Sequence, residues 1–222
     1  MNDLKTGLKL MRYTYGIRSN CIQAGVFLLM GLVFALSGEK GTFGFLGGYF
    51  WVCIAILPTQ LVYTLGVSHL VQASPMKRKV QTVFPVAINL AFMVVIYLIE
   101  IAIGGIYAWG NPQEAEGMYQ SLLLLATVMA LTMVYLGACY KYFVVPTLCL
   151  IPVLIIWMQG GMGKWMFTRL FLGSWNVSLG MAAAVGFGIL IVGALAEYLL
   201  TLLLYRAPLS RMAQAAPLRK AL

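Results

Sequence analysis

The feature that most constrains this chain is a series of apolar runs whose lengths match the thickness of a lipid bilayer. A helix needs about 20 apolar residues to cross a hydrocarbon core about 30 Å thick. Such runs occupy most of the chain and predict an all-α, polytopic membrane protein with six transmembrane helices. The predicted spans are residues 21–36, 43–67, 84–109, 118–140, 142–157 and 177–205.

The composition excludes the main alternatives to this fold class. Of the 222 residues, 62% are hydrophobic and only 9% are charged, whereas a soluble domain contains about 25% charged residues. Polar side chains are too few to cover a water-soluble surface, so a disordered chain, a coiled coil and a secreted disulfide scaffold are excluded. We expect one transmembrane domain over residues 1–222, with an interfacial helix at 1–19, a six-span bundle at 20–206 and a cytoplasmic tail at 207–222.

Lysine and arginine lie mainly on one side of the predicted bundle. With the N-terminus inside, the inner segments hold twelve of the fifteen cations, and the outer loops hold only Lys40, Lys164 and Arg169. The positive-inside rule therefore predicts a multi-pass protein of the plasma membrane with both termini cytoplasmic. The net charge of +9 indicates contact with anionic lipid, not with nucleic acid. The tryptophans are expected at or near the outer face, and they are Trp51, Trp109, Trp157, Trp165 and Trp175.

The N-terminal segment has the period of an amphipathic helix. Apolar side chains recur at steps of four, three and four residues, with a ridge of cations beside them. This pattern favours a helix lying in the inner membrane interface, although a basic flank without fixed structure remains an alternative. The residues concerned are Leu4, Lys5, Leu8, Lys9, Met11, Arg12 and Tyr15.

The inner segment between the second and third spans has the start signal of a helix. Ser74 suits the N-cap, and Pro75 suits the first helical position, where its missing N–H costs nothing. A short cytoplasmic helix would then carry Met76 and three cations into the third span. It is either a docking element for a soluble partner, with Met76 as an apolar contact, or only an anchor of topology. The three cations are Lys77, Arg78 and Lys79.

Two carboxylates lie within predicted spans, Glu100 in the third and Glu197 in the sixth. Ionisable residues are costly inside a membrane and are candidates for function by default. A structural role, or pairing of Glu197 with a nearby inner cation, is the alternative.

Small residues at intervals of four predict close helix packing. Gly44 and Gly48 have this spacing in the second span, and Gly180 and Gly188 continue it through Ala184 in the sixth. The pattern fits packing within the chain or between subunits.

The chain lacks the residues of an enzyme. Asp3 is the only aspartate and His69 the only histidine, so neither an aspartyl dyad nor an H-E-x-x-H metal helix is present. Gly163-Lys164 is followed by tryptophan instead of the serine or threonine of an ATP-binding loop. The four cysteines lack metal-site spacing. We therefore expect no catalytic residue, metal or cofactor in this chain. The cysteines are Cys21, Cys53, Cys139 and Cys149.

Taken together, the chain resembles the membrane subunit of a type-2 ATP-binding-cassette exporter over essentially its full length. The features that carry the resemblance are the basic amphipathic N-terminus, the Ser-Pro-Met-Lys-Arg-Lys segment at 74–79, the tight connection at Lys141, the short fifth span with the apolar outer segment after it, and the short basic tail. The stretch 73–80 is the most specific part, because it is similar to the small-Pro-apolar-basic stretch in the family's first inner loop. The sizeable extracellular domain of some family members has no counterpart.

The resemblance implies a mechanism and partners. Two copies of this chain would form the substrate pathway, and each would dock on a separate cytoplasmic ATPase that binds ATP and Mg²⁺. Residues 74–80 would be the coupling helix and the N-terminal segment an elbow-like interfacial helix. The substrates would be amphipathic peptides or other hydrophobic molecules.

Two other classes fit the same sequence. One is a proton-coupled secondary transporter with an inverted 3+3 repeat, because Glu100 and Glu197 occupy the third span of each half. The other is a non-transporting membrane scaffold or an immunity-type accessory protein. A stoichiometric soluble ATPase bound to the purified protein would favour the exporter.

Overall fold

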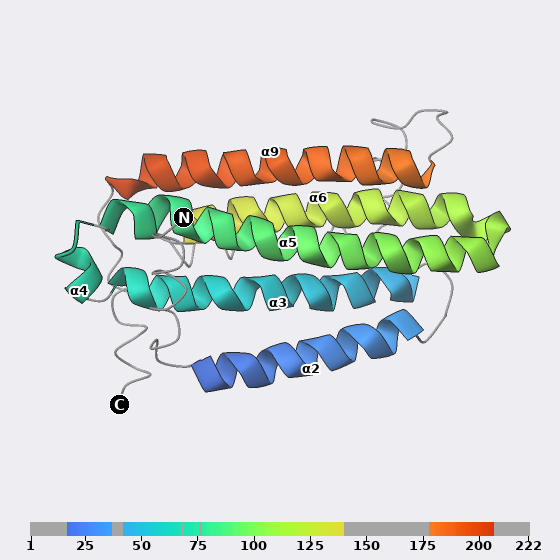
Figure 1. Ribbon diagram of the computed structural model, residues 1–222, viewed down its shortest axis with the longest axis horizontal. Helices are drawn as coiled ribbons and strands as arrows, with labels where there is room; N and C mark the ends of the chain where they lie inside the picture. Colours follow the sequence, from blue (N-terminus) through green and yellow to red (C-terminus); the bar gives the residue numbers. More distant parts are fainter. Residues whose placement is uncertain (1–16, 37–41, 68, 76, 140–177, 207–222) are drawn as a thin grey trace.

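The computed structural model describes residues 17–36, 42–67, 69–75, 77–139 and 178–206 (Figure 1). Within these ranges every regular element is a helix. The elements are α2 (Ile17–Leu36), α3 (Thr42–Val67), α4 (His69–Gln72), α5 (Lys77–Gly110), the 3₁₀ turn η1 (Pro112–Glu114), α6 (Ala115–Cys139) and α9 (Leu179–Tyr205).

Four of these helices, α2, α5, α6 and α9, are long and apolar enough to cross a membrane. Their most apolar windows have mean hydropathies between 1.5 and 2.5. Helix α3 has 26 residues and contains the apolar stretch Gly47–Pro58. The described helices therefore fit a multi-pass membrane protein, as the sequence predicts. The expected span at 142–157 lies outside the described residues, so the total of six spans stays a prediction.

Several helices begin earlier than the apolar runs predicted, and α5 and α2 differ most. Helix α5 starts at Lys77 instead of residue 84, and α2 starts at Ile17 instead of residue 21. Residues 17–19, which we assigned to the interfacial helix, thus belong to α2. Hydropathy marks only the part of a helix that suits hydrocarbon, whereas lysine, arginine and glutamine are good helix formers that continue a helix into the interface.

Proline residues lie inside two of the helices, Pro58 in α3 and Pro85 in α5. Pro85 is buried. Because proline has no N–H, the hydrogen bond that the Gln81 carbonyl would normally accept from residue 85 is missing. Starting the third span at residue 84 would have placed Pro85 in the first turn. The structure places it in the third turn of a continuous helix.

The long helices lie side by side in one elongated bundle (Figure 1). Helix α2 is outermost and packs on α3, α3 packs on α5, and α5, α6 and α9 contact one another. Helices α2 and α5 run in one direction, and α3, α6 and α9 run in the other (Figure 1). Cys139 and Ser178, on either side of the stretch 140–177, therefore lie at opposite ends of the bundle.

The two ends of the bundle differ in charge. All five lysine and arginine residues within the described ranges lie at the end where α2 and α5 begin and α9 finishes. We call this the basic end. At the opposite end, α6 carries Glu116 in its first turn, and Glu114 precedes it in η1. The cations of the basic end are Arg18, Lys77, Arg78, Lys79 and Arg206.

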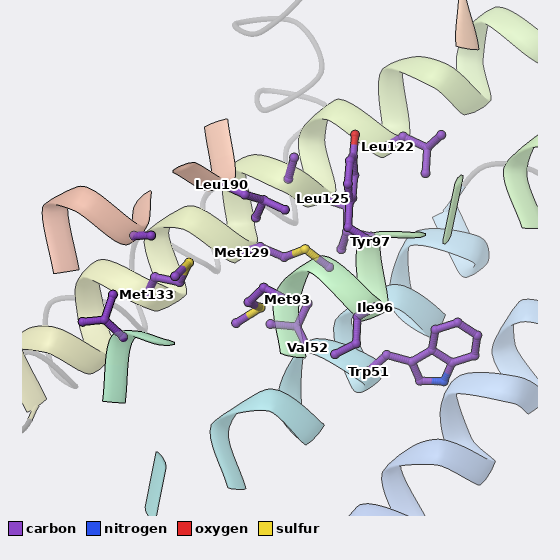
Figure 2. Close-up of a cluster of buried hydrophobic side chains, with 13 residues drawn as sticks. Trp51, Val52, Met93, Ile96, Tyr97, Leu122, Leu125, Met129, Met133 and Leu190 are labelled. Atoms are coloured by element: carbon purple, nitrogen blue, oxygen red, sulfur yellow. The ribbon is translucent and has the colours of Figure 1, made fainter. Parts of the chain in front are cut away.

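The main core lies where α5, α6 and α9 meet, with α3 closing one side (Figure 2). Met93 and Tyr97 of α5 pack there with Met129 and Met133 of α6 and Leu190 of α9. Methionine suits such a junction because its flexible side chain fills irregular gaps.

Glycines bring the backbones of α6 and α9 close together. A Cβ added at Gly193 would lie 2.8 Å from the Cα of Ala130 on α6. One at Gly137 would lie 3.1 Å from the carbonyl oxygen of Glu197. Small residues drive helix association in membranes in this way, because lipid gives no hydrophobic driving force between helices.

Candidate functional site

Polar side chains are buried along the inner faces of α5 and α9, where the surrounding core is apolar. The sequence pointed only to the two glutamates, because asparagine, glutamine and threonine do not interrupt an apolar run. Each buried polar group in a membrane bundle needs a partner or a function. The buried polar residues of these two helices are Gln81, Thr82, Asn89, Glu100, Glu197 and Thr201.

The strongest polar contact in the core joins α5 to α9. The Asn89 side-chain Nδ2 donates to Glu197 Oε1 over 2.6 Å, across a sequence separation of 108 residues. Asn89 is 0% exposed and Glu197 is 1% exposed. The second carboxyl oxygen, Oε2 of Glu197, is buried and has no hydrogen-bond partner within the described structure.

Helix α6 makes room for this pair at Gly137. A Cβ there would lie 3.2 Å from Cγ of Glu197, which is tighter than ordinary van der Waals contact. Toward the centre of the core, the next inward-facing residues on the three helices are Met93, Met133 and Ala194, all buried. The Asn89–Glu197 pair is therefore closed off on that side by apolar groups.

Glu100 lies in a different place from Glu197. It is eleven residues beyond Asn89 on α5, about 16 Å further along the helix axis. Its Oε1 lies 2.8 Å from where a Cβ on Gly48 of α3 would be, beside Leu125 of α6. The structure therefore buries both glutamates but does not bring them together. Within the described residues, no group of three or more His, Cys, Asp or Glu side chains could hold a metal ion.

A second polar contact between α5 and α9 was missed by the sequence analysis. The Tyr97 hydroxyl donates to the Ala182 carbonyl over 2.9 Å. Gly186, one turn further along α9, leaves the space for it, because a Cβ there would overlap the Tyr97 hydroxyl. A tyrosine within an apolar run gave no signal of this partner, which is 85 residues away.

At the basic end, the chain between α4 and α5 forms a turn. The Ser74 N–H donates to the Val71 carbonyl over 3.1 Å, and the Lys77 N–H donates to the Ser74 carbonyl over 3.0 Å. The predicted helix start at Pro75 is therefore two residues early. The three cations lie in the first turn of α5 itself, and no separate short helix carries them. Met76 lies outside the described residues.

The position of these cations is unfavourable for the helix. Lys77, Arg78 and Lys79 occupy the N-terminal turn of α5, where the helix dipole favours negative charge. Arg78 and Lys79 are exposed, as is Pro75. The positive charge is therefore not explained by helix stability, and it forms part of the outward surface of the basic end.

The predicted packing glycines have different surroundings. Gly48 is buried between α3, α5 and α6, whereas Gly180 and Gly188 are exposed on α9, where an added Cβ would have no atom within 4 Å. The outer stripe of α9 thus makes no close contact within the described chain. Gly44 lies in α3, and its contacts are outside the described set.

The predicted interfacial residues between 4 and 15 also lie outside the described residues.

The tryptophans within the described helices have unlike environments. Trp109 is 88% exposed at the end of α5, opposite to the basic end. Trp51 is buried in the core cluster, and a Cβ on Gly31 of α2 would overlap its indole ring. Of the two tryptophans in the described helices, Trp109 alone has the exposure that an interfacial tryptophan needs, and Trp157, Trp165 and Trp175 lie outside the described residues.

No protein-family model, curated protein or solved structure is found to match this chain.

Proposed function

We propose that this chain is the membrane subunit of an exporter driven by a separate cytoplasmic ATPase of the ATP-binding-cassette type. The observation that carries the proposal is the position of the turn at 73–75 and the first turn of α5. Pro75, Arg78 and Lys79 of this segment are exposed. The segment is basic, and it connects α3, through α4, to α5. A partner that moves this segment also moves the core.

Helix α5 is the element that would transmit such a movement. It is one helix of 34 residues, about 50 Å long. Its first turn carries the cations, and further along it carries Asn89 and Tyr97, which both bond to α9. A displacement at Lys77 would therefore reach α9 through two hydrogen bonds inside the membrane.

In the proposed arrangement the basic end faces the cytoplasm of the plasma membrane. Two copies of the chain form the pathway, and each docks on one ATPase, which binds ATP and Mg²⁺ and hydrolyses the ATP. The outer stripe of α9, with Gly180 and Gly188, is the surface offered to the second copy, because it is apolar and lets two backbones approach. The substrates are amphipathic peptides or other hydrophobic molecules.

The proposal is tested by purifying the chain from its native membrane and measuring the bound ATPase. Arg78→Glu should weaken ATPase association roughly tenfold, because it reverses a charge at the contact. Met76→Asp should weaken it further if Met76 fills an apolar groove. Neither variant should alter membrane insertion, because most of the basic residues remain.

Arg206→Glu is the matched control, since it makes the same charge change at the same end but on α9. It should leave ATPase association unchanged. A purified native protein that carries no ATPase, or equal losses in Arg78→Glu and Arg206→Glu, would contradict the proposal. ATP hydrolysis by the single chain, with other ATPases excluded, would contradict it as well.

A further inference from the structure

One carboxyl oxygen of Glu197, Oε2, is a buried polar atom without a hydrogen-bond partner among the described residues. The other oxygen, Oε1, accepts the short bond from Asn89, whereas Oε2 accepts none within the described structure. A buried carboxyl oxygen left in this way costs free energy unless it binds something.

No positive charge near Glu197 compensates an ionised carboxylate within the described chain. The five cations of the described ranges all lie at the basic end, and the one closest in sequence is Arg206, nine residues or about 13 Å away along α9. On each of the three packed helices, we take the titratable side chains closest along the helix to the residue at this contact, which is Asn89 on α5, Gly137 on α6 and Glu197 itself on α9. None of these side chains carries a positive charge. They are Tyr97 on α5, Tyr135 and Cys139 on α6, and Tyr198 on α9.

Within the described residues, the surroundings of Glu197 do not fit a metal ion. Calcium needs about six oxygen ligands or more, whereas Glu197 offers one uncommitted oxygen. Gly137 presses against the same side chain, and the inward neighbours Met93 and Met133 supply no oxygen. A proton needs only the one oxygen that is available.

We propose that Glu197 is a proton-binding site, with the proton on Oε2 and the carbonyl character on Oε1, where the Asn89 amide donates. In this state the carboxyl is neutral, and α9 packs against α5 and Gly137 without burying a charge. Release of the proton leaves a carboxylate that requires water or a cation, so the contact between α5 and α9 weakens. Protonation of Glu197 thereby controls how tightly α9 closes on α5.

This inference does not rest on the exporter proposal. A proton site between α5 and α9 serves an ATP-driven exporter as a condition for closing the bundle, and it serves a proton-coupled carrier as the coupling site. The test therefore uses the full-length chain alone and needs neither substrate nor ATPase. Loss of the exporter proposal would leave it intact.

Infrared spectroscopy of the purified full-length chain at neutral pH detects the carbonyl stretch of a protonated carboxyl. Glu197→Gln should remove one such band. Asn89→Leu should keep the band and move it to higher frequency, because it removes the hydrogen bond to the carbonyl oxygen. Glu100→Gln is the matched control, since it removes the other intramembrane carboxyl and should leave the Glu197 band unchanged.

A second measurement needs no variant and remains decisive if Glu197→Gln fails to fold. Dicyclohexylcarbodiimide is a hydrophobic reagent that reacts with protonated carboxyls, and mass spectrometry locates the adduct. Labelling of Glu197 in the native chain supports the proton site. A wild-type chain without labelling at Glu197, or a difference spectrum without a protonated carbonyl band in Glu197→Gln, would overturn it.

Discussion

Helices α2 and α6 are both long and apolar, yet α6 is mostly buried inside the bundle and α2 is mostly exposed at its edge. Their most apolar windows have mean hydropathies of 1.5 and 2.2, but 6% of the α2 window is buried against 67% for α6. Helix α6 lies between α5 and α9, whereas α2 packs mainly along α3. Hydropathy therefore indicates that a helix can cross the membrane. It does not indicate whether other helices or lipid surround that helix.

The contacts at the two helices differ in kind. Helix α6 meets α9 backbone to backbone, at Gly193 and Gly137. Helix α2 meets α3 through side chains, with Phe34 stacked on Phe50 at 5.3 Å between ring centroids. The Asn20 amide adds a bond of 3.3 Å to the Leu57 carbonyl. The contact of α6 with α9 is therefore made by backbone atoms, and the contact of α2 with α3 is made by side chains.

The largest effect is expected from filling the closest backbone contact of the core. Gly193→Ala places a methyl group against the Cα of Ala130, and a backbone atom cannot move aside as a side chain can. We expect a loss of about 1–3 kcal/mol in the free energy of unfolding, measured by denaturant titration in detergent.

The control for this change is Gly25→Ala, at an exposed position within α2 where an added Cβ would have nothing within 4 Å. It should be neutral or stabilising by up to about 1 kcal/mol, since alanine is the better helix former. Equal destabilisation by both variants would show that α9 is not held at Gly193.

A smaller loss of stability is expected from removing the hydrogen bond that Tyr97 donates. Tyr97→Phe keeps the aromatic ring, whose centroid lies 5.3 Å from that of Phe187. It removes the hydroxyl that donates to the Ala182 carbonyl. The expected loss is about 0.6 kcal/mol, the average for such bonds in membrane bundles. The same denaturant titration measures it, and an unchanged midpoint would mean that α9 is held by packing alone.

The smallest effect on global stability is expected at α2. Phe34→Leu removes the half-buried ring that stacks on Phe50, so α2 should lose part of its contact with α3 while the core stays folded. We expect the free energy of unfolding to change by less than about 0.5 kcal/mol. Disulfide cross-linking between Asn20→Cys and Leu57→Cys, in a chain without the native cysteines, should nevertheless fall.

A large loss of global stability in Phe34→Leu would contradict the distinction between the core and a peripheral α2. Trp51→Phe provides a check on the α3 side. It removes the indole nitrogen, which is buried without a hydrogen-bond partner in the described structure, so it should not destabilise the protein through a lost bond.

The sequence predicted the positions of the described spans because apolar length is a local property. It could not predict which small residues pack, because Gly180 and Gly188 have the expected spacing but face outward, whereas Gly186 and Gly193 face the core. It identified Glu197 as costly but not Asn89 as its partner. That pairing depends on how α5 and α9 lie in space, and an asparagine in an apolar run has no local signature.

The sequence also did not predict where the helices begin. Ser74 and Pro75 form a reasonable start signal, yet the chain makes a turn there and α5 begins at Lys77. Arg78, Lys79 and Gln81 are good helix formers, and no glycine or proline lies between Lys77 and the apolar run, so nothing separates an inner helix from the third span. One long helix results where the sequence suggested a short helix followed by a span.

The unequal charge of the two ends has a consequence for how the protein responds to membrane voltage. Carrying one charge across a bilayer held at 100 mV involves about 2.3 kcal/mol. With the basic end on the negative side, as proposed, transferring its five described cations to the positive side would cost about 11.5 kcal/mol at that voltage. In the proposed orientation, an energised membrane therefore adds a voltage-dependent term that opposes inversion of the inserted bundle.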